Sequence, residues 1–233
     1  RGKRYNDTTH TNVSFVKRRN KMVLSLPELF ELIGTIAFAL SGSFVAVSKK
    51  MDLFGVNILA VVTACGGGLF RDLVVGNTPP VMFRDPFYAI IAIAVANTVF
   101  ILLKTQQHLP KKMVHFYDRT LFWFDTFGLA AFTIDGLMVG IKAGYQDNFF
   151  LVVFLGFTTG VGGGVLRDVF ANQIPDIFRK HVYASASIAG GIAMAILLNI
   201  TGKQLPAMLL GFSLIILLRT LAEHFRWNLP KIS

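Results

Sequence analysis

Seven long apolar windows most strongly limit how this chain can fold. They cover residues 32–48, 53–70, 86–103, 121–141, 148–166, 182–202 and 204–218. A helix needs about 20 apolar residues to cross the hydrocarbon core of a bilayer, with a range of about 17–25, and the windows fit once their ends are extended. Because backbone groups in lipid must bond within their own segment, we predict an all-α membrane protein with seven transmembrane helices.

The composition agrees with this prediction and excludes several functional classes. Only 15% of the 233 residues are charged, whereas 53% are hydrophobic. Soluble domains usually carry about 25% charged residues. No metal-ligand spacing, nucleophile–base pair or phosphate loop is present, so we expect neither an enzyme nor a cofactor. The single cysteine, Cys65, can form no disulfide within the chain.

Basic residues are concentrated at the start of the chain. Residues 1–21 carry seven Lys and Arg side chains and one acidic residue, Asp7, and supply most of the net charge of +10. This segment is polar and shows no helical periodicity, so we expect a leader or a vector-derived segment, with Met22 as the initiator. A nucleic-acid-binding tail is the alternative, but no other feature favours it, and we expect no nucleic-acid partner.

The loops between the windows predict the orientation in the membrane. One side carries Lys49, Lys50, the connecting loop 104–119, Arg179, Lys180, Arg226 and Lys231, and the other, without the leader, carries mainly Arg84, Lys142 and Lys203. The positive-inside rule therefore predicts a cytoplasmic C-terminus and an N-terminus outside.

The chain contains an internal repeat. The segment CGGGLFRD at 65–72 recurs 96 positions later as VGGGVLRD at 161–168. Matches continue upstream from Gly34, paired with Gly128, and downstream to Ala89, paired with Ala184, with small gaps. A match over about 60 positions indicates a duplication.

Each repeat holds three spans, an odd number, so the second repeat enters the membrane from the opposite side. This predicts a 3+3 inverted repeat plus one extra helix. We expect a leader at 1–21, a first repeat at 22–103, a basic connecting loop at 104–119, a second repeat at 120–202, and the seventh helix with the tail at 203–233. Inverted repeats recur in transporters, whose sites lie between the repeats on discontinuous helices.

Three successive glycines in each repeat predict an irregular point in the second and fifth spans. The triads are Gly66, Gly67 and Gly68, and Gly162, Gly163 and Gly164. Glycine in a helix costs about 1 kcal/mol relative to alanine, so we expect a kink or break at each triad. The carbonyls freed at Gly66, Gly67, Gly162 and Gly163 could then coordinate a monovalent cation. Close helix packing at small residues is the alternative explanation.

An arginine follows each triad, at Arg71 and at Arg167. Arginine within a span normally faces a polar interior, where it can set an electrostatic barrier or hold a carboxylate. Extension of the side chain to the membrane interface is the alternative. Because both copies keep the arginine, we favour a role in permeation or binding.

Several other polar residues are weaker candidates. Asp72 and Asp168 adjoin the arginines and can balance their charge. Asp135 lies within the fourth span, and Ser41 takes its place in the first repeat, so this carboxylate is not duplicated; it would either attract cations or pair with a basic residue. Thr63 and Thr159 would line a path or bond within the helices.

The two motif segments resemble a known family. GGGLFRDLVVGNTPPVMFRDPFYA and GGGVLRDVFANQIPDIFRKHVYA are similar to the two signatures of bacterial relatives of the trimeric intracellular cation (TRIC) channels, a group also labelled a glycine transporter domain. The resemblance implies three protomers, each with its own pore between glycine-kinked helices two and five. It also implies that Arg71 and Arg167 are the basic residues of that pore.

From the residues and this resemblance together, we expect a homotrimeric, lipid-embedded channel of the bacterial inner membrane that conducts potassium and sodium. A secondary transporter of glycine or another small amino acid is the main alternative, because the same architecture could hold a carboxylate at an arginine. A membrane scaffold without transport is a third possibility, in which triad substitutions would alter folding but no flux.

Overall fold

The computed structural model describes residues 25–105, 113–179 and 182–227. Within these ranges the helices are α1 (Leu26–Ser48), α2 (Leu53–Val74), α3 (Val81–Arg84), α4 (Phe87–Thr105), α5 (Met113–Lys142), α6 (Phe149–Phe170), α7 (Asp176–Arg179), α8 (Ala184–Thr201) and α9 (Gln204–His224). The predicted leader at 1–21, Met22, residues 106–112 of the basic loop, Lys180 and Lys231 lie outside the described residues.

Seven of these helices, α1, α2, α4, α5, α6, α8 and α9, are long and apolar enough to cross a membrane. The predicted number of spans and the all-α class are therefore confirmed. Polar residues mark where several spans begin: Asp52 accepts a hydrogen bond from the Gly55 N–H at 2.8 Å, and Asn148 accepts one from the Leu151 N–H at 3.0 Å. Such caps satisfy N–H groups that the first helical turn leaves without an internal partner.

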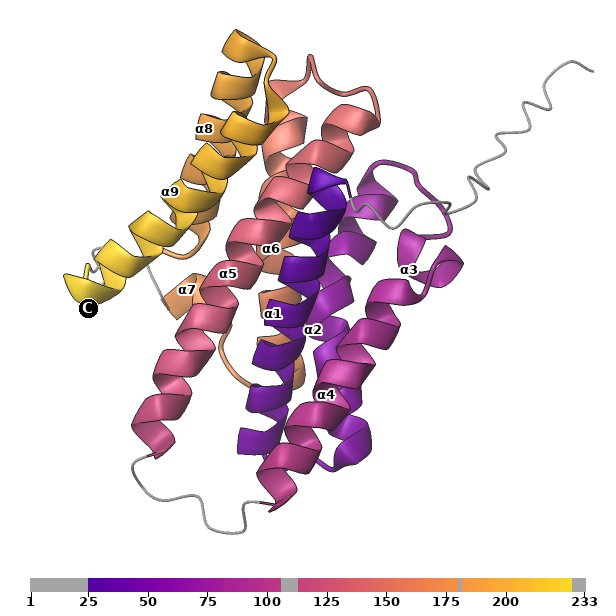
Figure 1. The fold of residues 1–233 in the computed structure, drawn as a ribbon, viewed down its shortest axis with the longest axis vertical. Helices are drawn as coiled ribbons and strands as arrows, with labels where there is room; N and C mark the ends of the chain where they lie inside the picture. The colour runs from indigo at the N-terminus through magenta and orange to yellow at the C-terminus, as the bar shows by residue number, and fades with distance from the viewer. Residues whose placement is uncertain (1–24, 106–112, 180–181, 228–233) are drawn as a thin grey trace, which may run out of the picture.

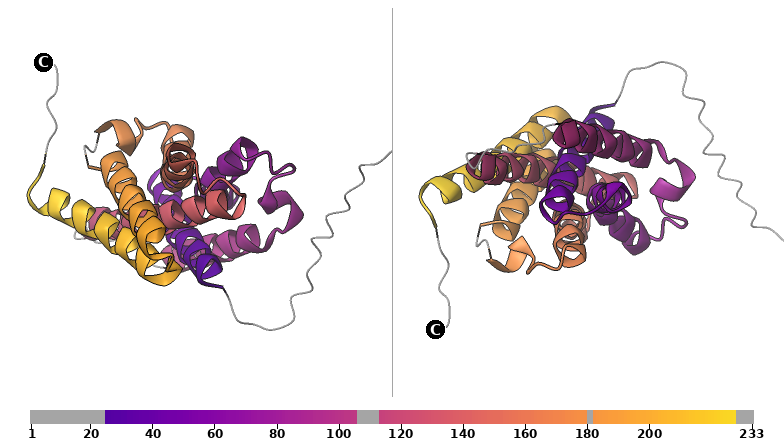
Figure 2. Two further views of the ribbon diagram at one scale, coloured as in Figure 1. Left: turned by 90° about the horizontal axis from the view of Figure 1, so that it is seen from above. Right: turned by 90° about the horizontal axis from the view of Figure 1, so that it is seen from below.

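The contacts between helices follow the duplication. In each repeat the first helix packs on the second (α1 on α2, α5 on α6), and both pack on the third (α4 or α8). The repeats meet where α1 packs on α5 and α2 packs on α6, so these four helices form the centre of the bundle. Figure 1 shows α4 on one flank of the bundle and α8 with α9 on the other. Figure 2 shows the same arrangement seen from above and from below.

Two short helices, α3 and α7, lie between the second and third spans of the repeats and were not predicted. Asp72 accepts a hydrogen bond from the Val81 N–H at 2.8 Å, and Asp168 accepts one from the Asp176 N–H at 3.0 Å. Each aspartate thus holds the first N–H of a short helix. This contact joins residues eight or nine positions apart, so helical periodicity gives no sign of it.

Glycines bring α2 and α6 into direct backbone contact. A Cβ atom added at Gly67 would overlap the Thr159 carbonyl oxygen, and one added at Gly163 would overlap the Thr63 carbonyl oxygen. These are equivalent contacts in the two repeats. They are the close packing that small residues permit between membrane helices.

The structure has no break at either triad, and a kink there stays a prediction. Both α2 and α6 are continuous α-helices through their triads. A broken hydrogen bond in lipid costs several kcal/mol per backbone group, more than the weak helical preference of the glycines. In a regular helix each carbonyl accepts the N–H four residues ahead, so the carbonyls of Gly66, Gly67, Gly162 and Gly163 are engaged within their own helices.

Candidate functional site

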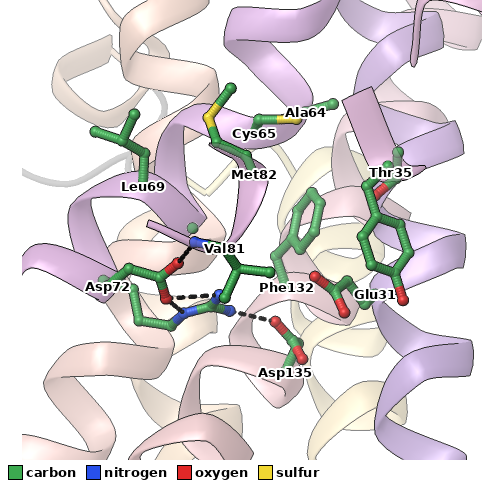
Figure 3. Close-up of a pocket in the computed structure, with 13 residues that line it drawn as sticks. Glu31, Thr35, Ala64, Cys65, Leu69, Asp72, Val81, Met82, Phe132 and Asp135 are labelled. Carbon is green, nitrogen blue, oxygen red and sulfur yellow. Dashed lines mark hydrogen bonds and ion pairs between the residues drawn. The ribbon is translucent and has the colours of Figure 1, made fainter. Parts of the chain in front are cut away.

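The first of two buried charged clusters forms around Arg71 in the last turn of α2. Its Nη1 donates to Asp135 Oδ2 of α5 at 2.6 Å, and its Nε donates to Asp72 Oδ1 at 3.0 Å. Glu31 of α1 interacts electrostatically with Arg71 and Asp135, and Tyr88 hydrogen-bonds to it. We call Arg71, Asp72, Asp135, Glu31 and Tyr88 the Arg71 cluster. Figure 3 shows Asp72 and Asp135 converging on one guanidinium, with Glu31 beside them.

The second cluster forms around Arg167 in the last turn of α6. Arg167 Nη1 donates to Asp125 Oδ1 at 2.7 Å and to Ser41 Oγ at 2.5 Å, and its Nε donates to Asp168 Oδ1 at 2.8 Å. The Tyr183 hydroxyl donates to Asp125 Oδ1 at 3.4 Å.

Arg219 of α9 completes this second set. Its Nη2 lies 3.3 Å from Asp125 Oδ2, and its Nε donates to Thr126 Oγ1 at 3.1 Å. We call the set Arg167, Asp168, Asp125, Ser41, Tyr183 and Arg219 the Arg167 cluster.

Both arginines contact the other repeat. Arg71 of the first repeat binds Asp135 of the second, and Arg167 of the second binds Ser41 of the first. Asp135 and Ser41 are equivalent positions, so the two contacts are related by the internal two-fold axis. Both guanidinium groups are almost fully buried, with Arg71 at 4% and Arg167 at 2% exposure. These side chains therefore do not extend along the protein surface to the membrane interface. Asp135 pairs with a basic residue, which was one of its two predicted alternatives.

A small cavity opens beside the Arg71 cluster. Its volume is about 40 Å³, and Glu31, Thr35, Cys65 and Asp135 are among the residues that line it. One water needs roughly 10–15 Å³ of such space when enough polar partners surround it. The carboxylate oxygens and the Thr35 hydroxyl supply acceptors for water or for a small cation, and the guanidinium supplies donors for an anionic group.

The other predicted residues have structural contacts. Thr63 and Thr159 each donate at 2.6 Å to a carbonyl four residues earlier, of Leu59 and Leu155. Both also pack where α2 and α6 touch. Asp72 and Asp168 link the arginines to α3 and α7. The clusters follow the triads in α2 and α6, and because the inverted repeats run in opposite directions, they lie on opposite sides of the glycine contact.

Glu31, Asp125 and Arg219 were not predicted from the sequence as members of these clusters. Glu31 and Asp125 are equivalent positions, so extending the repeat comparison three residues upstream of Gly34 would have found both. Arg219 lies on α9, outside the repeat, and gave no comparable signal.

Known proteins resemble this chain over most of its length. A family model described as "Glycine transporter" matches residues 28–104 and 122–199. The inner membrane protein YadS of Escherichia coli (strain K12) is 36% identical over 204 residues, which cover 87% of this chain and 94% of that protein.

Two solved structures share the fold. The TRIC trimeric intracellular cation channel orthologue from Rhodobacter sphaeroides has a TM-score of 0.79 and 29% identity, covering 88% of this chain and all of that chain (100%). A structure described in a study of conductance through TRIC cation channels has a TM-score of 0.75 and 32% identity, covering 90% of this chain and 98% of that chain. This chain therefore belongs to the glycine transporter family of membrane proteins, the TRIC family that its two signatures predicted.

Proposed function

We propose that this protein is a channel for monovalent cations, chiefly potassium and also sodium, in a bacterial inner membrane. We further propose that it acts as a homotrimer with one path through each protomer. The resemblance to solved TRIC cation channels over nearly the whole chain supports the first proposal, and the description of one of them as a trimer supports the second. The name of YadS as an inner membrane protein supports the location.

The observation that carries this proposal is the placement of the two buried charged clusters. Charged groups within a membrane are costly and commonly mark an ion path. Here they lie on either side of the place where Gly67 contacts Thr159 and Gly163 contacts Thr63. A path along α2 and α6 would therefore be closed at this contact, with a buried charged cluster on each side. Conduction would require α2 and α6 to separate and each guanidinium to leave at least one carboxylate.

We propose that the Arg71 cluster faces outwards and the Arg167 cluster faces the cytoplasm. Lys49 and Lys50 follow α1, and Arg226 follows α9. Because successive spans alternate in direction, the C-terminal ends of α1 and α9 lie on the same side of the membrane. The positive-inside rule makes that side cytoplasmic. Cysteine labelling from each side of intact vesicles, at Lys50 or Arg226 changed to cysteine in a Cys65→Ser background, tests this orientation.

Planar-bilayer recording tests the channel. Purified protein should give unitary currents in potassium chloride and in sodium chloride, with a reversal potential in a salt gradient that favours cations. If a preparation shown to be a folded trimer gives no unitary current in either salt, the proposal is wrong.

One observation favours a carrier of glycine as a second candidate. The cavity at the Arg71 cluster offers a guanidinium for a carboxylate, and Glu31 with Asp135 for an ammonium group. The family model that matches the chain is also described as a glycine transporter. Saturable uptake of radiolabelled glycine into proteoliposomes, dependent on an ion gradient, would favour this candidate over a channel.

A further inference from the structure

The two charged clusters share a framework that the duplication supplies. Each has an arginine after the glycine triad, the aspartate next to it, a carboxyl group on the first helix of the repeat, and a tyrosine at the beginning of the third helix of the repeat. These groups are Arg71, Asp72, Glu31 and Tyr88 in the first cluster, and Arg167, Asp168, Asp125 and Tyr183 in the second. The aspartate and the carboxyl group on the first helix face one guanidinium, so the duplicated part alone has one carboxyl group in excess on each side.

Two departures from the repeat make the clusters unequal. Asp135 adds a third carboxylate to the Arg71 cluster, whereas its counterpart in the Arg167 cluster is the uncharged Ser41. Arg219 adds a second guanidinium to the Arg167 cluster and has no counterpart in either repeat. One guanidinium faces three carboxyl groups in the first cluster, and two guanidinium groups face two carboxyl groups in the second. The Arg71 cluster thus has two carboxyl groups in excess, and the Arg167 cluster has none.

Arg219 is built into the Arg167 cluster. The residue is 3% exposed. Its guanidinium lies 4.6 Å from the Tyr183 ring centroid and 5.0 Å from the Phe122 ring centroid. It binds one Asp125 oxygen while Arg167 binds the other, so both oxygens of this carboxylate face a guanidinium.

Among the described residues, no second cation joins the Arg71 cluster in the same way. The next positive charge that acts on Asp135 is Lys142, which is exposed two turns further along α5. Thr35, which lines the adjoining cavity, is 1% exposed. In the described part of the chain its hydroxyl has no hydrogen-bond partner, whereas the hydroxyl groups of Thr63 and Thr159 bond to their own helices. An unpartnered hydroxyl in an acidic cavity is available to a cation or its water.

We propose that Arg219, through its positive charge in the Arg167 cluster, makes cation conduction through each protomer asymmetric. This inference rests on the proposed channel function. A cation is held by the excess of carboxyl groups at the Arg71 cluster, and its main barrier is the Arg167 cluster, where guanidinium and carboxyl groups are equal in number. Because fixed charges set electrostatic barriers in pores, the currents in the two directions differ. The seventh helix, outside the symmetry of the repeat, thereby gives an internally symmetric path a direction.

The repeat offers variants that test this inference. Arg219→Gln leaves one carboxyl group in excess in the Arg167 cluster, and Asp135→Ser, which copies the residue at the equivalent position, leaves one in excess in the Arg71 cluster. Each single variant should reduce the rectification ratio of single-channel currents in symmetric potassium chloride, by about threefold or less for a charge partly screened by water. The double variant should bring the ratio close to unity. Arg226→Gln, at an exposed position beyond α9, is the matched control and should keep the wild-type ratio.

The outcomes separate this inference from the proposed function. An absence of wild-type current overturns both. Two results overturn this inference alone. One is a wild-type cation current that is already symmetric, and the other is a wild-type rectification ratio in folded Arg219→Gln and double-variant channels. If Arg219→Gln does not assemble, Asp135→Ser still provides a test, because it changes the opposite cluster. An unchanged rectification ratio in Asp135→Ser also counts against the inference.

Discussion

Substitution of Gly67 by alanine should destabilise the protein by forcing α2 and α6 apart. The added methyl group would overlap the Thr159 carbonyl oxygen and would also approach the Thr159 carbonyl carbon at 3.0 Å. A carbon normally lies about 3.3–3.6 Å from a carbonyl oxygen, so the helices would have to separate by roughly 1 Å. Both contact atoms belong to the backbone, and no change of rotamer can relieve the overlap.

The magnitude follows from two opposing terms. Overpacking a well-packed interior costs about 1–3 kcal/mol, and we expect the upper part of this range because the contact is with backbone. Replacing a helical glycine by alanine returns about 1 kcal/mol. The net loss is then about 1–2 kcal/mol, which corresponds to a decrease in Tm of roughly 2–8 °C for a chain of this size.

Gly68→Ala is the matched control. The atom nearest to its added Cβ is the Arg71 Nη2, at 3.5 Å, which is an ordinary contact. Only the gain in helical preference then applies, and the Tm should stay the same or rise. Thermal unfolding of both variants in one detergent, followed by size-exclusion chromatography, measures the difference. Equal Tm values for Gly67→Ala and Gly68→Ala would refute the role of Gly67 in helix contact.

Three further substitutions test the charged clusters. Asp125→Asn removes the carboxylate that Arg167 and Arg219 share and should cost about 3–5 kcal/mol, seen as a large fall in Tm; a change below about 1 kcal/mol would contradict the pairing. Arg71→Ala should cause leak or altered rectification in bilayer recordings if the protein is a channel, whereas a carrier should instead lose affinity for glycine in uptake assays. Thr35→Val should change the free energy of unfolding by less than about 0.5 kcal/mol, because the hydroxyl has no hydrogen-bond partner among the described residues, yet it should lower the unitary cation conductance. An unchanged conductance would exclude this hydroxyl from the path.

The glycine triads show how a correct pattern led to the prediction of a helix break that the structure does not have. Three glycines in an apolar window predicted a weak point in the helix, because helix propensity was the only energy that the pattern expressed. In the structure the triads lie where another helix contacts them. Packing of Gly67 and Gly163 against the Thr159 and Thr63 carbonyls favours a continuous helix, in agreement with the alternative of close packing.

The arginines show the opposite case. The duplication alone identified Arg71 and Arg167 as paired features. It did not identify their partners, since Asp135 and Ser41 come from the other repeat, far away in sequence. Glu31 and Asp125 could have been found by extending the alignment. No pattern could have predicted Arg219, because α9 has no counterpart against which to compare it.

By itself the sequence determined the number of spans, the inverted repeat and the family, because these depend on the length of apolar windows, on their parity and on direct matches between segments. The tertiary structure decided which groups meet: the α2–α6 contact, the crossed contacts of the arginines, and the addition of Arg219 to only one cluster. Burial explains the division. Apolar length is a property of a segment, whereas the pairing of a buried charge depends on every helix that encloses it.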